Sequence, residues 1–360
     1  MKILLDVSPY LRGPFTGIGL CAYRCSNAIL EKWKELKSPN YEIEIVHRGR
    51  SAIEAESDIK QMSLASRFLG SRHEIYHCFE MRLPSAIRSK KIIAIHDLWT
   101  LRKNSFQSED FQNQQRAKII RAIERADWIV TASSYVQNEL IALYPKLKNS
   151  SSTIPWGSMI DSDKPPQLEV PVQLRKDLKD FLKSTSLFFL VNACLENRKN
   201  QKWLIQKILK FPNYKCVFVG GKGFGYESIQ PLILQHPQQF AHFTGISSEE
   251  LMYLYRSCRA LILPSLEEGF GIPVVEALKL SVPLILSRIP PFEEIAGDTA
   301  KYFDPLGNGE DLLAIIKNLV ENPKIPTAIE SVEVSKKLEK FLWPNIAGQY
   351  LDIYQKLTTR

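Results

Sequence analysis

Residues 268–276 read Glu268-Gly269-Phe270-Gly271-Ile272-Pro273-Val274-Val275-Glu276. An apolar, strand-like run at 260–264 precedes this stretch, and an apolar pattern of helical period follows it. Pro273 suits the first position of a helix, where its missing N–H costs nothing. The stretch therefore predicts a strand, a glycine-bearing loop and the start of a helix, which is the repeating arrangement of an α/β fold.

The residue types around this helix start point to a ligand. Gly269 and Gly271 let the backbone approach a bound molecule, and the N–H groups of a helix start suit an anionic phosphate. Glu268 and Glu276 can accept hydrogen bonds from hydroxyls on either side of that phosphate, which describes a nucleotide sugar. Acids also favour the positive end of a helix for structural reasons, so the spacing alone leaves both interpretations open.

The bulk properties are those of a globular chain. Its 360 residues predict two domains of roughly 150–200 residues, and 44% hydrophobic with 24% charged residues is ordinary. We expect no membrane span and no signal peptide, because no apolar run is long enough and an acid follows at position 6. The six cysteines are scattered along the chain, and they do not form the two closely spaced pairs that a zinc site needs. We therefore expect reduced thiols in a cytoplasmic protein.

The positive charge is concentrated in the first half. Residues 1–156 hold 23 of the 47 Lys and Arg but only 16 of the 39 Asp and Glu. This excess would attract an anionic lipid or a phosphorylated acceptor, or would serve solubility alone. No nucleic-acid fold signature is present, so we expect no nucleic-acid partner. Four basic residues with three isoleucines on the intervening face predict either a membrane-surface helix or, with preference, an amphipathic core helix: Arg116, Lys118, Ile119, Ile120, Arg121, Ile123 and Arg125.

Strand and helix patterns alternate along both halves of the chain. Strands are expected at Ile3–Val7, Glu42–Val46, Ile75–Cys78, Ile92–His96, Trp128–Ala132, Leu187–Val191, Cys216–Val219, Phe240–Thr244, Arg259–Leu263 and Pro283–Leu286. Helices are expected at 17–35, Ser133–Leu143 and Pro344–Leu357. Such alternation predicts two doubly wound parallel sheets, with a ligand cleft between the carboxyl ends of their strands.

The domain boundaries follow from a polar, proline-bearing linker at 158–172. We expect an N-terminal acceptor-binding Rossmann-like domain at 1–165 and a C-terminal nucleotide-sugar-binding Rossmann-like domain at 166–342. The remaining residues, 343–360, form a helix that would pack back on the first domain.

Glycines also mark the turn after the first strand. Gly17 and Gly19 end the run 13–19 and would free backbone N–H groups for a phosphate at a helix start. With Ala22 they match the dinucleotide fingerprint G-x-G-x-x-A, which keeps an NAD(P) oxidoreductase open as an alternative. A structural turn is the simpler interpretation of the same residues.

Three further sites follow strand ends. Arg198 and Lys199 come after the first strand of the second half, where two cations would neutralise a diphosphate. His96 ends a buried strand and would donate to a sugar hydroxyl or a developing charge, or serve as a structural hydrogen-bonder. The loop 220–225, with four glycines, would approach a nucleotide or act as a mobile turn.

Taken together, these residues resemble the retaining glycosyltransferases of family 4, which have the GT-B fold: two Rossmann-like domains facing each other across a cleft. The resemblance covers most of the chain and is densest at 263–277, with its E-x7-E spacing. The other motifs that carry it are Thr16-Gly17-Ile18-Gly19, Ile95-His96-Asp97-Leu98, Thr131-Ala132-Ser133, Arg198-Lys199-Asn200, Phe243-Thr244-Gly245, Val282-Pro283-Leu284-Ile285, Glu294-Ile295-Ala296-Gly297-Asp298 and Trp343.

The resemblance implies a role for each site residue. Glu268 would bind the hydroxyls of the donor sugar, and Glu276 would hold the ribose. Lys199 and Arg198 would clamp the diphosphate, and His96 would lie near the reacting sugar. Catalysis would thus depend on His96 and Glu268, and donor binding on Gly17, Gly19, Arg198, Lys199, Gly269, Phe270, Gly271 and Glu276. No metal and no cofactor beyond the donor are expected.

The same resemblance implies the reaction. We expect transfer of a hexose, with retention, from a nucleoside diphosphate sugar to a glycan or lipid-linked acceptor. The motifs at 95–98 and 221–227 resemble the mannosyltransferase-like branch, which favours GDP-mannose; UDP- or dTDP-sugars, a sugar-nucleotide epimerase and a non-catalytic sensor stay open. The chain would be cytoplasmic, with a peripheral contact at the inner face of an anionic membrane. Asn192-Ala193 replaces the Gly-Arg or Gly-Thr of many members, which puts a second arginine on the diphosphate in doubt.

Overall fold

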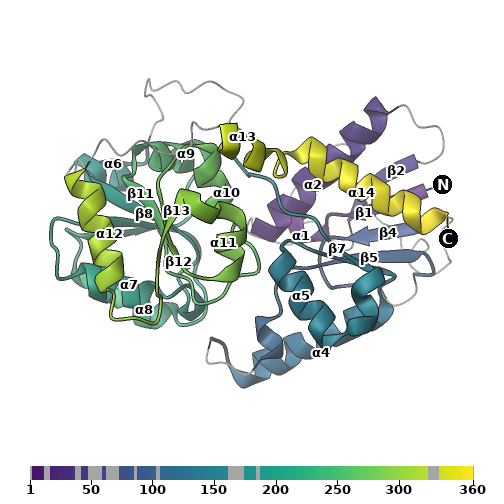
Figure 1. Ribbon diagram of the computed structural model, residues 1–360, viewed down its shortest axis with the longest axis horizontal. Coiled ribbons are helices and arrows are strands. Elements are labelled where there is room, and N and C mark those ends of the chain that lie inside the picture. Colours follow the sequence, from purple (N-terminus) through teal and green to yellow (C-terminus); the bar gives the residue numbers. More distant parts are fainter. Residues whose placement is uncertain are drawn as a thin grey trace. The chain divides into compact units, whose positions relative to one another are not determined.

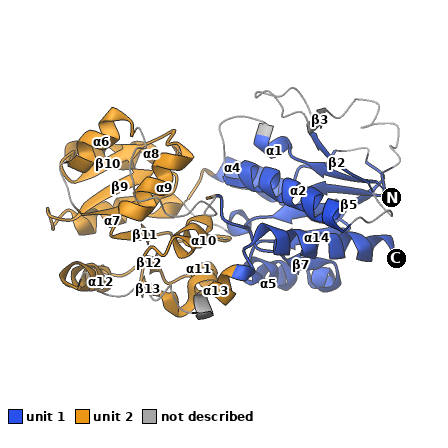
Figure 2. Cartoon of the chain, turned by 90° about the horizontal axis from the view of Figure 1, so that it is seen from above, with its two compact units in different colours: residues 1–103, 109–159, 339–360 blue, residues 104–108, 160–338 orange. Residues whose placement is uncertain are grey.

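The computed structural model describes residues 2–11, 17–36, 42–47, 59–61, 73–84, 87–102, 106–160, 174–183, 187–322 and 332–359. The chain divides into two compact units, coloured separately in Figure 2. Unit 1 comprises 1–103, 109–159 and 339–360, and unit 2 comprises 104–108 and 160–338. Most of the expected linker lies outside the described residues, as does the run 12–16.

Unit 1 contains a seven-stranded parallel sheet in the order β3-β2-β1-β4-β5-β6-β7. Its strands are β1 (Lys2–Asp6), β2 (Glu42–His47), β3 (Ile59–Gln61), β4 (Ile75–Cys78), β5 (Lys90–Ile95), β6 (Trp128–Thr131) and β7 (Ser151–Thr153). The central strands are apolar on both faces, because helices cover both sides of a parallel sheet. β1 and β4 are adjacent, so the chain winds outward from them in both directions.

The helices of unit 1 are α1 (Ser8–Leu11), α2 (Gly17–Glu35), η1 (Trp99–Leu101), α4 (Glu109–Arg125), α5 (Ser134–Leu143), η2 (Pro145–Asn149) and α14 (Trp343–Thr358). The last helix, yellow in Figure 1, packs along α2, purple, although they lie at opposite ends of the sequence. Tyr354 of α14 is hydrogen-bonded to Nδ1 of the buried His77 on β4 at 2.7 Å. The C-terminal helix is therefore part of the core of unit 1.

The basic helix α4 is an amphipathic core helix, which is the preferred of the two sequence interpretations. Ile119 and Ile123 are buried with β5 and α5. Arg116 donates to the carbonyl of Leu101, and Arg125 donates to carbonyls in the segment after β4. Two of its four basic residues thus serve the fold.

Unit 2 contains a six-stranded parallel sheet in the order β10-β9-β8-β11-β12-β13. Its strands are β8 (Phe188–Asn192), β9 (Lys215–Val219), β10 (Phe240–Phe243), β11 (Ala260–Leu263), β12 (Leu284–Ser287) and β13 (Ala300–Phe303). Its helices are α6 (Lys176–Lys183), η3 (Asn197–Lys199), α7 (Gln201–Ile208), α8 (Tyr226–Gln235), α9 (Ser248–Ser257), α10 (Ile272–Lys279), α11 (Pro290–Ala296), η4 (Gly297–Thr299), α12 (Glu310–Glu321) and α13 (Val332–Glu339). This strand order is that of a dinucleotide-binding Rossmann sheet.

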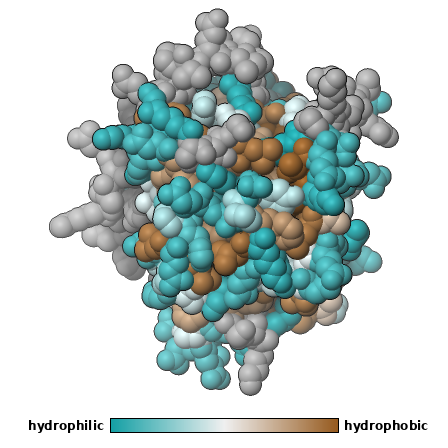
Figure 3. Space-filling model, turned by 90° about the vertical axis from the view of Figure 1, so that its left-hand side faces the viewer, coloured by the Kyte–Doolittle hydropathy of each residue, from teal (hydrophilic) through white to brown (hydrophobic). Residues whose placement is uncertain are grey.

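Three further features are the character of the helices, the distribution of apolar residues on the surface and the state of the cysteines. Across the part of the chain that the structure describes, no helix combines the length and apolar character needed to cross a membrane. On the face of unit 2 seen in Figure 3, apolar residues appear in separate patches among polar ones. All six cysteines are free thiols, as expected from the sequence, although Cys194 is exposed.

Candidate active site

The predicted donor residues of unit 2 gather at the carboxyl ends of β8 and β11. These two strands are neighbours at the centre of the sheet, and the chain continues from them to opposite edges. In open α/β sheets this switch point is where ligands bind. The chain leaves β8 into η3, which carries Arg198 and Lys199, and leaves β11 into the loop 264–271 before α10.

Glu268 is the centre of this cluster. Its Oε1 accepts hydrogen bonds from Lys199 Nζ at 2.6 Å and from Ser265 Oγ at 2.8 Å. Its Oε2 lies 3.2 Å from Nη1 of Arg198. The side chains of Glu268, Arg198 and Lys199 are only 13–15% exposed. The adjacent residues Arg198 and Lys199 therefore meet Glu268, about 70 positions later in the sequence, in one partly buried ionic cluster.

Arg198 also connects the two loops. Its Nη1 donates to the carbonyl of Glu267 at 2.7 Å, and its Nη2 donates to Glu196 Oε1 at 2.8 Å. Its own carbonyl accepts from Leu266 N at 2.9 Å. The loops after β8 and β11 are thus fixed to each other, and the guanidinium plane has a set direction.

The cluster keeps Glu268 ionised. Burial on its own would raise the pKa of this carboxyl group, but the positive charges of Lys199 and Arg198, with hydrogen bonds from Lys199 and Ser265, outweigh it and lower the pKa below its ordinary value of 4.5. Glu268 is therefore a carboxylate at neutral pH. As such it can accept hydrogen bonds from the hydroxyls of a ligand.

Glu276, the second acid of the pair, has a different environment. It is 3% exposed and lies in α10. Its Oε2 accepts from Tyr255 Oη at 2.7 Å and from Asn192 Nδ2 at 3.4 Å, and Asn192 Nδ2 also donates to Tyr255 Oη at 2.9 Å. Burial, followed by the negative charge of Glu276, raises the pKa of Tyr255 well above its ordinary value. The phenol and the amide that donate to Oε2 are therefore both neutral.

The glycines of the loop 220–225 have a packing function that neither sequence interpretation anticipated. Gly225 has φ +87°, and a Cβ on it would overlap the Asn197 side chain. A Cβ on Gly223 would lie 2.5 Å from Cβ of Glu196. Leu195 N donates to the Gly221 carbonyl, and Gly223 N donates to the Leu195 carbonyl, each at 2.9 Å. This loop therefore supports the segment that leads into Arg198.

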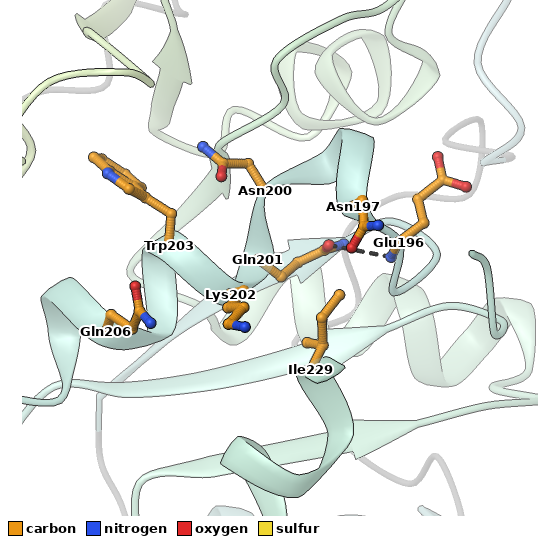
Figure 4. A pocket seen from close by; sticks show the side chains of 8 residues that line it. All are labelled: Glu196, Asn197, Asn200, Gln201, Lys202, Trp203, Gln206 and Ile229. Carbon is orange, nitrogen blue, oxygen red and sulfur yellow. Dashed lines mark hydrogen bonds between the residues drawn. The ribbon is translucent and has the colours of Figure 1, made fainter. Parts of the chain in front are cut away.

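A polar hollow of about 230 Å³ lies beside the same segment. The residues lining it are Glu196, Asn197, Asn200, Gln201, Lys202, Trp203, Gln206 and Ile229 (Figure 4). Gln201, which is fully buried, accepts from Glu196 N at 3.3 Å and donates to the Cys194 carbonyl at 2.6 Å. The first residue of α7 thus secures the loop after β8 from a second side.

The loop glycine Gly271 and its neighbour Phe270 are shaped by packing. Gly271 has φ +151°, and a Cβ there would lie 2.9 Å from the Phe292 ring. Phe270 is buried, as is Gly269. The tight path of the chain before α10 therefore depends on Gly271, whatever ligand approaches the helix start.

The other predicted site residues lie in unit 1. His96 follows β5, is half-buried, and its Nε2 lies 2.9 Å from the Phe79 carbonyl. Its ring lies 5.6 Å from that of Trp156. Burial lowers the pKa of His96, against the opposing effects of the Phe79 carbonyl, Asp97 and Glu80. The ring is neutral at pH 7, and because a carbonyl can only accept, its Nε2 carries the proton and its Nδ1 is the acceptor.

Gly17 and Gly19 open α2 in unit 1. Gly17 is exposed, but Gly19 is buried, and a Cβ there would lie 2.8 Å from the Pro9 carbonyl oxygen. Contact between α2 and α1 is thus one reason for a glycine at position 19. The donor-binding role of both glycines stays a prediction.

Sequence reasoning did not identify Ser265, Tyr255 or Gln201. Ser265 lies within the resembling stretch, but its bond to Glu268 depends on the turn of the loop. Tyr255 is separated from Glu276 by 21 residues, and in sequence it looks like one more aromatic residue of a helix. Within the described residues, no group of three or more His, Cys, Asp or Glu side chains is placed to hold a metal ion.

Comparison with known proteins places these features in a family. Residues 175–333, nearly all of unit 2, match the family model described as "Glycosyl transferases group 1". The chain is 24% identical over 301 residues to O-antigen chain mannosyltransferase B of Escherichia coli, covering 79% of this chain and 74% of that protein. It is 28% identical over 224 residues to the serotype-specific mannosyltransferase WbdA of Escherichia coli, covering 58% of this chain and 27% of the much longer relative.

Solved structures show the fold over the full length. Sucrose-phosphate synthase of Thermosynechococcus elongatus superposes with a TM-score of 0.74 at 15% identity, covering 99% of both chains. HepE of Anabaena, solved with UDP-glucose, superposes with a TM-score of 0.71 at 16% identity, covering 99% of this chain and 100% of that chain. The chain therefore carries a group 1 glycosyltransferase domain, has the GT-B fold and is a glycosyltransferase.

Proposed function

We propose that this enzyme transfers a hexose, with retention of anomeric configuration, from a nucleoside diphosphate sugar to a hydroxyl of a glycan or lipid-linked acceptor. The observation that carries the proposal is the ionic cluster at the switch point of unit 2, where Lys199 and Arg198 converge on Glu268. Two fixed cations beside a helix start suit a diphosphate, and an ionised carboxylate between them suits the hydroxyls of a sugar.

Each part of the cluster has a task in the reaction. Lys199 and Arg198 stabilise the negative charge that develops on the departing diphosphate, which is electrostatic catalysis by groups already in place. Glu268 orients the sugar through its hydroxyls. His96 acts as the neutral imidazole that faces the reacting sugar. No metal or cofactor is required in this scheme, because the two side-chain cations and the start of α10 supply the positive charge.

The stereochemical course follows from how the carboxylates are engaged. Glu268 is bonded to Lys199, Arg198 and Ser265, so it is poorly suited to act as a covalent nucleophile. We infer that the bond from the anomeric carbon to the phosphate oxygen breaks while the acceptor oxygen bonds to that carbon on the same face. The acceptor proton passes to the departing phosphate oxygen, which leaves the nucleoside diphosphate and a retained glycoside.

The choice of sugar is supported by the relatives. O-antigen chain mannosyltransferase B and WbdA are named as mannosyltransferases, so mannose from GDP-mannose is the donor that we propose. HepE was solved with UDP-glucose, which makes UDP-sugars the second class to test. An O-antigen-like acceptor is lipid-linked, and the basic charge of residues 1–156 is consistent with a cytoplasmic enzyme that contacts the inner face of an anionic membrane.

A thermal-shift panel tests the donor class. Each of GDP-mannose, UDP-glucose, dTDP-glucose and ADP-glucose is added at the same concentration, and the tightest ligand gives the largest rise in Tm by mass action. We expect GDP-mannose to give the largest rise, and Glu268→Ala to keep the fold but lose transfer to an added acceptor. A panel without any shift, or near-normal turnover in the variant, would overturn the proposal. Release of an isomerised free sugar nucleotide would instead identify an epimerase.

A further inference from the structure

Glu268 and Glu276 accept hydrogen bonds from donors of different kinds. Glu268 is bonded to the cations Lys199 and Arg198, whereas Oε2 of Glu276 accepts from a phenol and an amide, Tyr255 and Asn192. A neutral donor fixes the direction of a carboxylate without cancelling its charge. The phenol and the amide thus help to set the direction of the Glu276 carboxylate.

The three residues form a chain with a fixed direction. The amide nitrogen of Asn192 can only donate, and it lies 2.9 Å from Tyr255 Oη. That phenol oxygen therefore accepts from Asn192 and places its own proton on Glu276 Oε2, at 2.7 Å. Tyr255 is fully buried, so bulk water does not compete for this bond.

The backbone around Tyr255 is equally well fixed. Its helix α9 begins with a capping box, in which Ser247 accepts from Glu250 N at 3.1 Å and Glu250 accepts from Ser247 N at 3.0 Å. Asn192 is the last residue of β8, a central strand of the sheet. A rigid helix and a rigid strand thus position one carboxylate of α10.

We propose that Tyr255, assisted by Asn192, is a positioning residue that aims the Glu276 carboxylate at the 2′- and 3′-hydroxyls of the donor ribose, so that the site selects ribonucleoside over 2′-deoxyribonucleoside diphosphate sugars. The inference rests on the proposed function and on the ribose-binding role that the family resemblance implies for Glu276. It adds a donor class that this site rejects: 2′-deoxy donors such as dTDP-sugars.

The test compares two ligands that differ by one hydroxyl. The dissociation constants of GDP and 2′-deoxy-GDP are measured by calorimetry for the wild-type chain and for Tyr255→Phe. The wild type should bind GDP at least tenfold more tightly, since a hydrogen bond to a charged group is worth about one to two powers of ten. In Tyr255→Phe the Glu276 carboxylate loses its 2.7 Å bond from the phenol, so its direction is less well set and the ratio should fall to about threefold or less.

A merely structural role of Tyr255 would give another result. Loss of packing would weaken both nucleotides by the same factor and leave their ratio unchanged, which would overturn the inference while leaving the proposed function intact. Failure of the wild type to bind GDP, UDP or any of their sugars would instead overturn the proposed function itself. The two failures are therefore distinguishable in one set of titrations.

Two further variants sharpen the test. Asn192→Ala removes the donor to Tyr255 and should lower the GDP to 2′-deoxy-GDP ratio in the same direction by a smaller factor. Tyr253→Phe, a half-buried tyrosine two residues earlier on α9, removes a hydroxyl from the same helix and should leave the ratio at its wild-type value. An equal fall of the ratio in Tyr253→Phe and Tyr255→Phe would contradict a specific role for Tyr255.

Discussion

Lys199 Nζ lies 2.6 Å from Glu268 Oε1, so the cation proposed to hold the diphosphate is bonded directly to the acid proposed to hold the sugar. The sequence separates the two residues by 69 positions, and the adjacency of β8 and β11 brings them together. A donor that binds here must share Lys199 with Glu268. Binding of the sugar hydroxyls and binding of the diphosphate are for that reason coupled through one ion pair.

Removal of the Lys199 charge should weaken the binding of nucleoside diphosphates. In Lys199→Ala we expect the dissociation constant of GDP, measured by calorimetry, to rise about 10- to 100-fold, as for a lost charge-assisted hydrogen bond. GMP, which lacks the second phosphate, should be affected much less. Lys202→Ala is the matched control, because Lys202 is an exposed lysine three residues later, in α7, and no bond from it to Glu268 is found among the described residues. Equal effects on GDP and GMP would count against a diphosphate clamp.

The stability contribution of Glu268 should depend on pH in a definite direction. Its pKa in the folded chain lies below the ordinary value of 4.5, so the unfolded chain binds a proton first as the pH falls. The stabilisation is therefore fully present above about pH 4.5 and is lost as the pH falls through the lower, folded pKa.

Glu268→Gln measures that contribution. At pH 7 the variant should have a free energy of unfolding lower by about 2 kcal/mol in urea titrations, because Gln cannot pair with Lys199 and Arg198. The difference from the wild type should narrow as the pH falls below about 4.5. A difference that stays constant over this range would show that the ion pair does not stabilise the fold.

The pattern of apolar residues predicts much of the architecture, but it does not predict the shortest strands. The helix at 17–35 and the strand at 75–78 have the bounds that the sequence predicts, because each is long or strongly apolar. Three short strands were not predicted. β3 and β7 have three residues each, and β13 buries only its first and last residues, so local sequence carries little signal there.

The candidate site likewise contains some features that the sequence predicts and others that it does not. Strand ends predict that Arg198, Lys199 and Glu268 face one edge of a sheet, since the carboxyl ends of parallel strands meet there. The contacts of Tyr255 with Glu276 and of Gly225 with Asn197 depend on side-chain direction between elements distant in sequence. Spacing along a single chain contains no information on such pairs, which is why the packing of the loop 220–225 against Asn197 was not predicted.

A side chain at position 225 should disturb the loop that precedes Arg198. Gly225→Ala combines a strained φ of +87° with an overlap with Asn197, and we expect a loss of about 2–4 kcal/mol in unfolding free energy. Gly245→Ala is the matched control, because Gly245 has φ +63° but no atom within 4 Å of the added Cβ. It should lose only about 1 kcal/mol.

The double variant Gly225→Ala/Asn197→Ala separates the two causes. Shortening Asn197 removes most of the overlap, so urea titration should give a stability closer to that of Gly245→Ala than to that of Gly225→Ala. GDP affinity should recover in parallel, since the displaced segment carries Arg198. No recovery in either measurement would mean that backbone strain alone accounts for the glycine.

The attachment of α14 to unit 1 gives a test that needs no ligand. Tyr354 Oη is hydrogen-bonded to His77 Nδ1 at 2.7 Å, and His77 Nε2 has no hydrogen-bond partner among the residues that the structure describes. Burial lowers the pKa of His77 to about 3, so the ring is neutral. Tyr354→Phe would leave both ring nitrogens of a buried histidine without a partner, which should lower the free energy of unfolding by about 1–3 kcal/mol.

Tyr350→Phe provides the comparison on the same helix. Tyr350 is equally buried and its ring lies 4.8 Å from that of His77, but its hydroxyl has no hydrogen-bond partner in the structure. Removing an unsatisfied hydroxyl costs no hydrogen bond and relieves a buried polar group, so urea titration should show a stability equal to or above that of the wild type. Losses of similar size in Tyr350→Phe and Tyr354→Phe would show that α14 is held by ring packing and not by the hydrogen bond to His77.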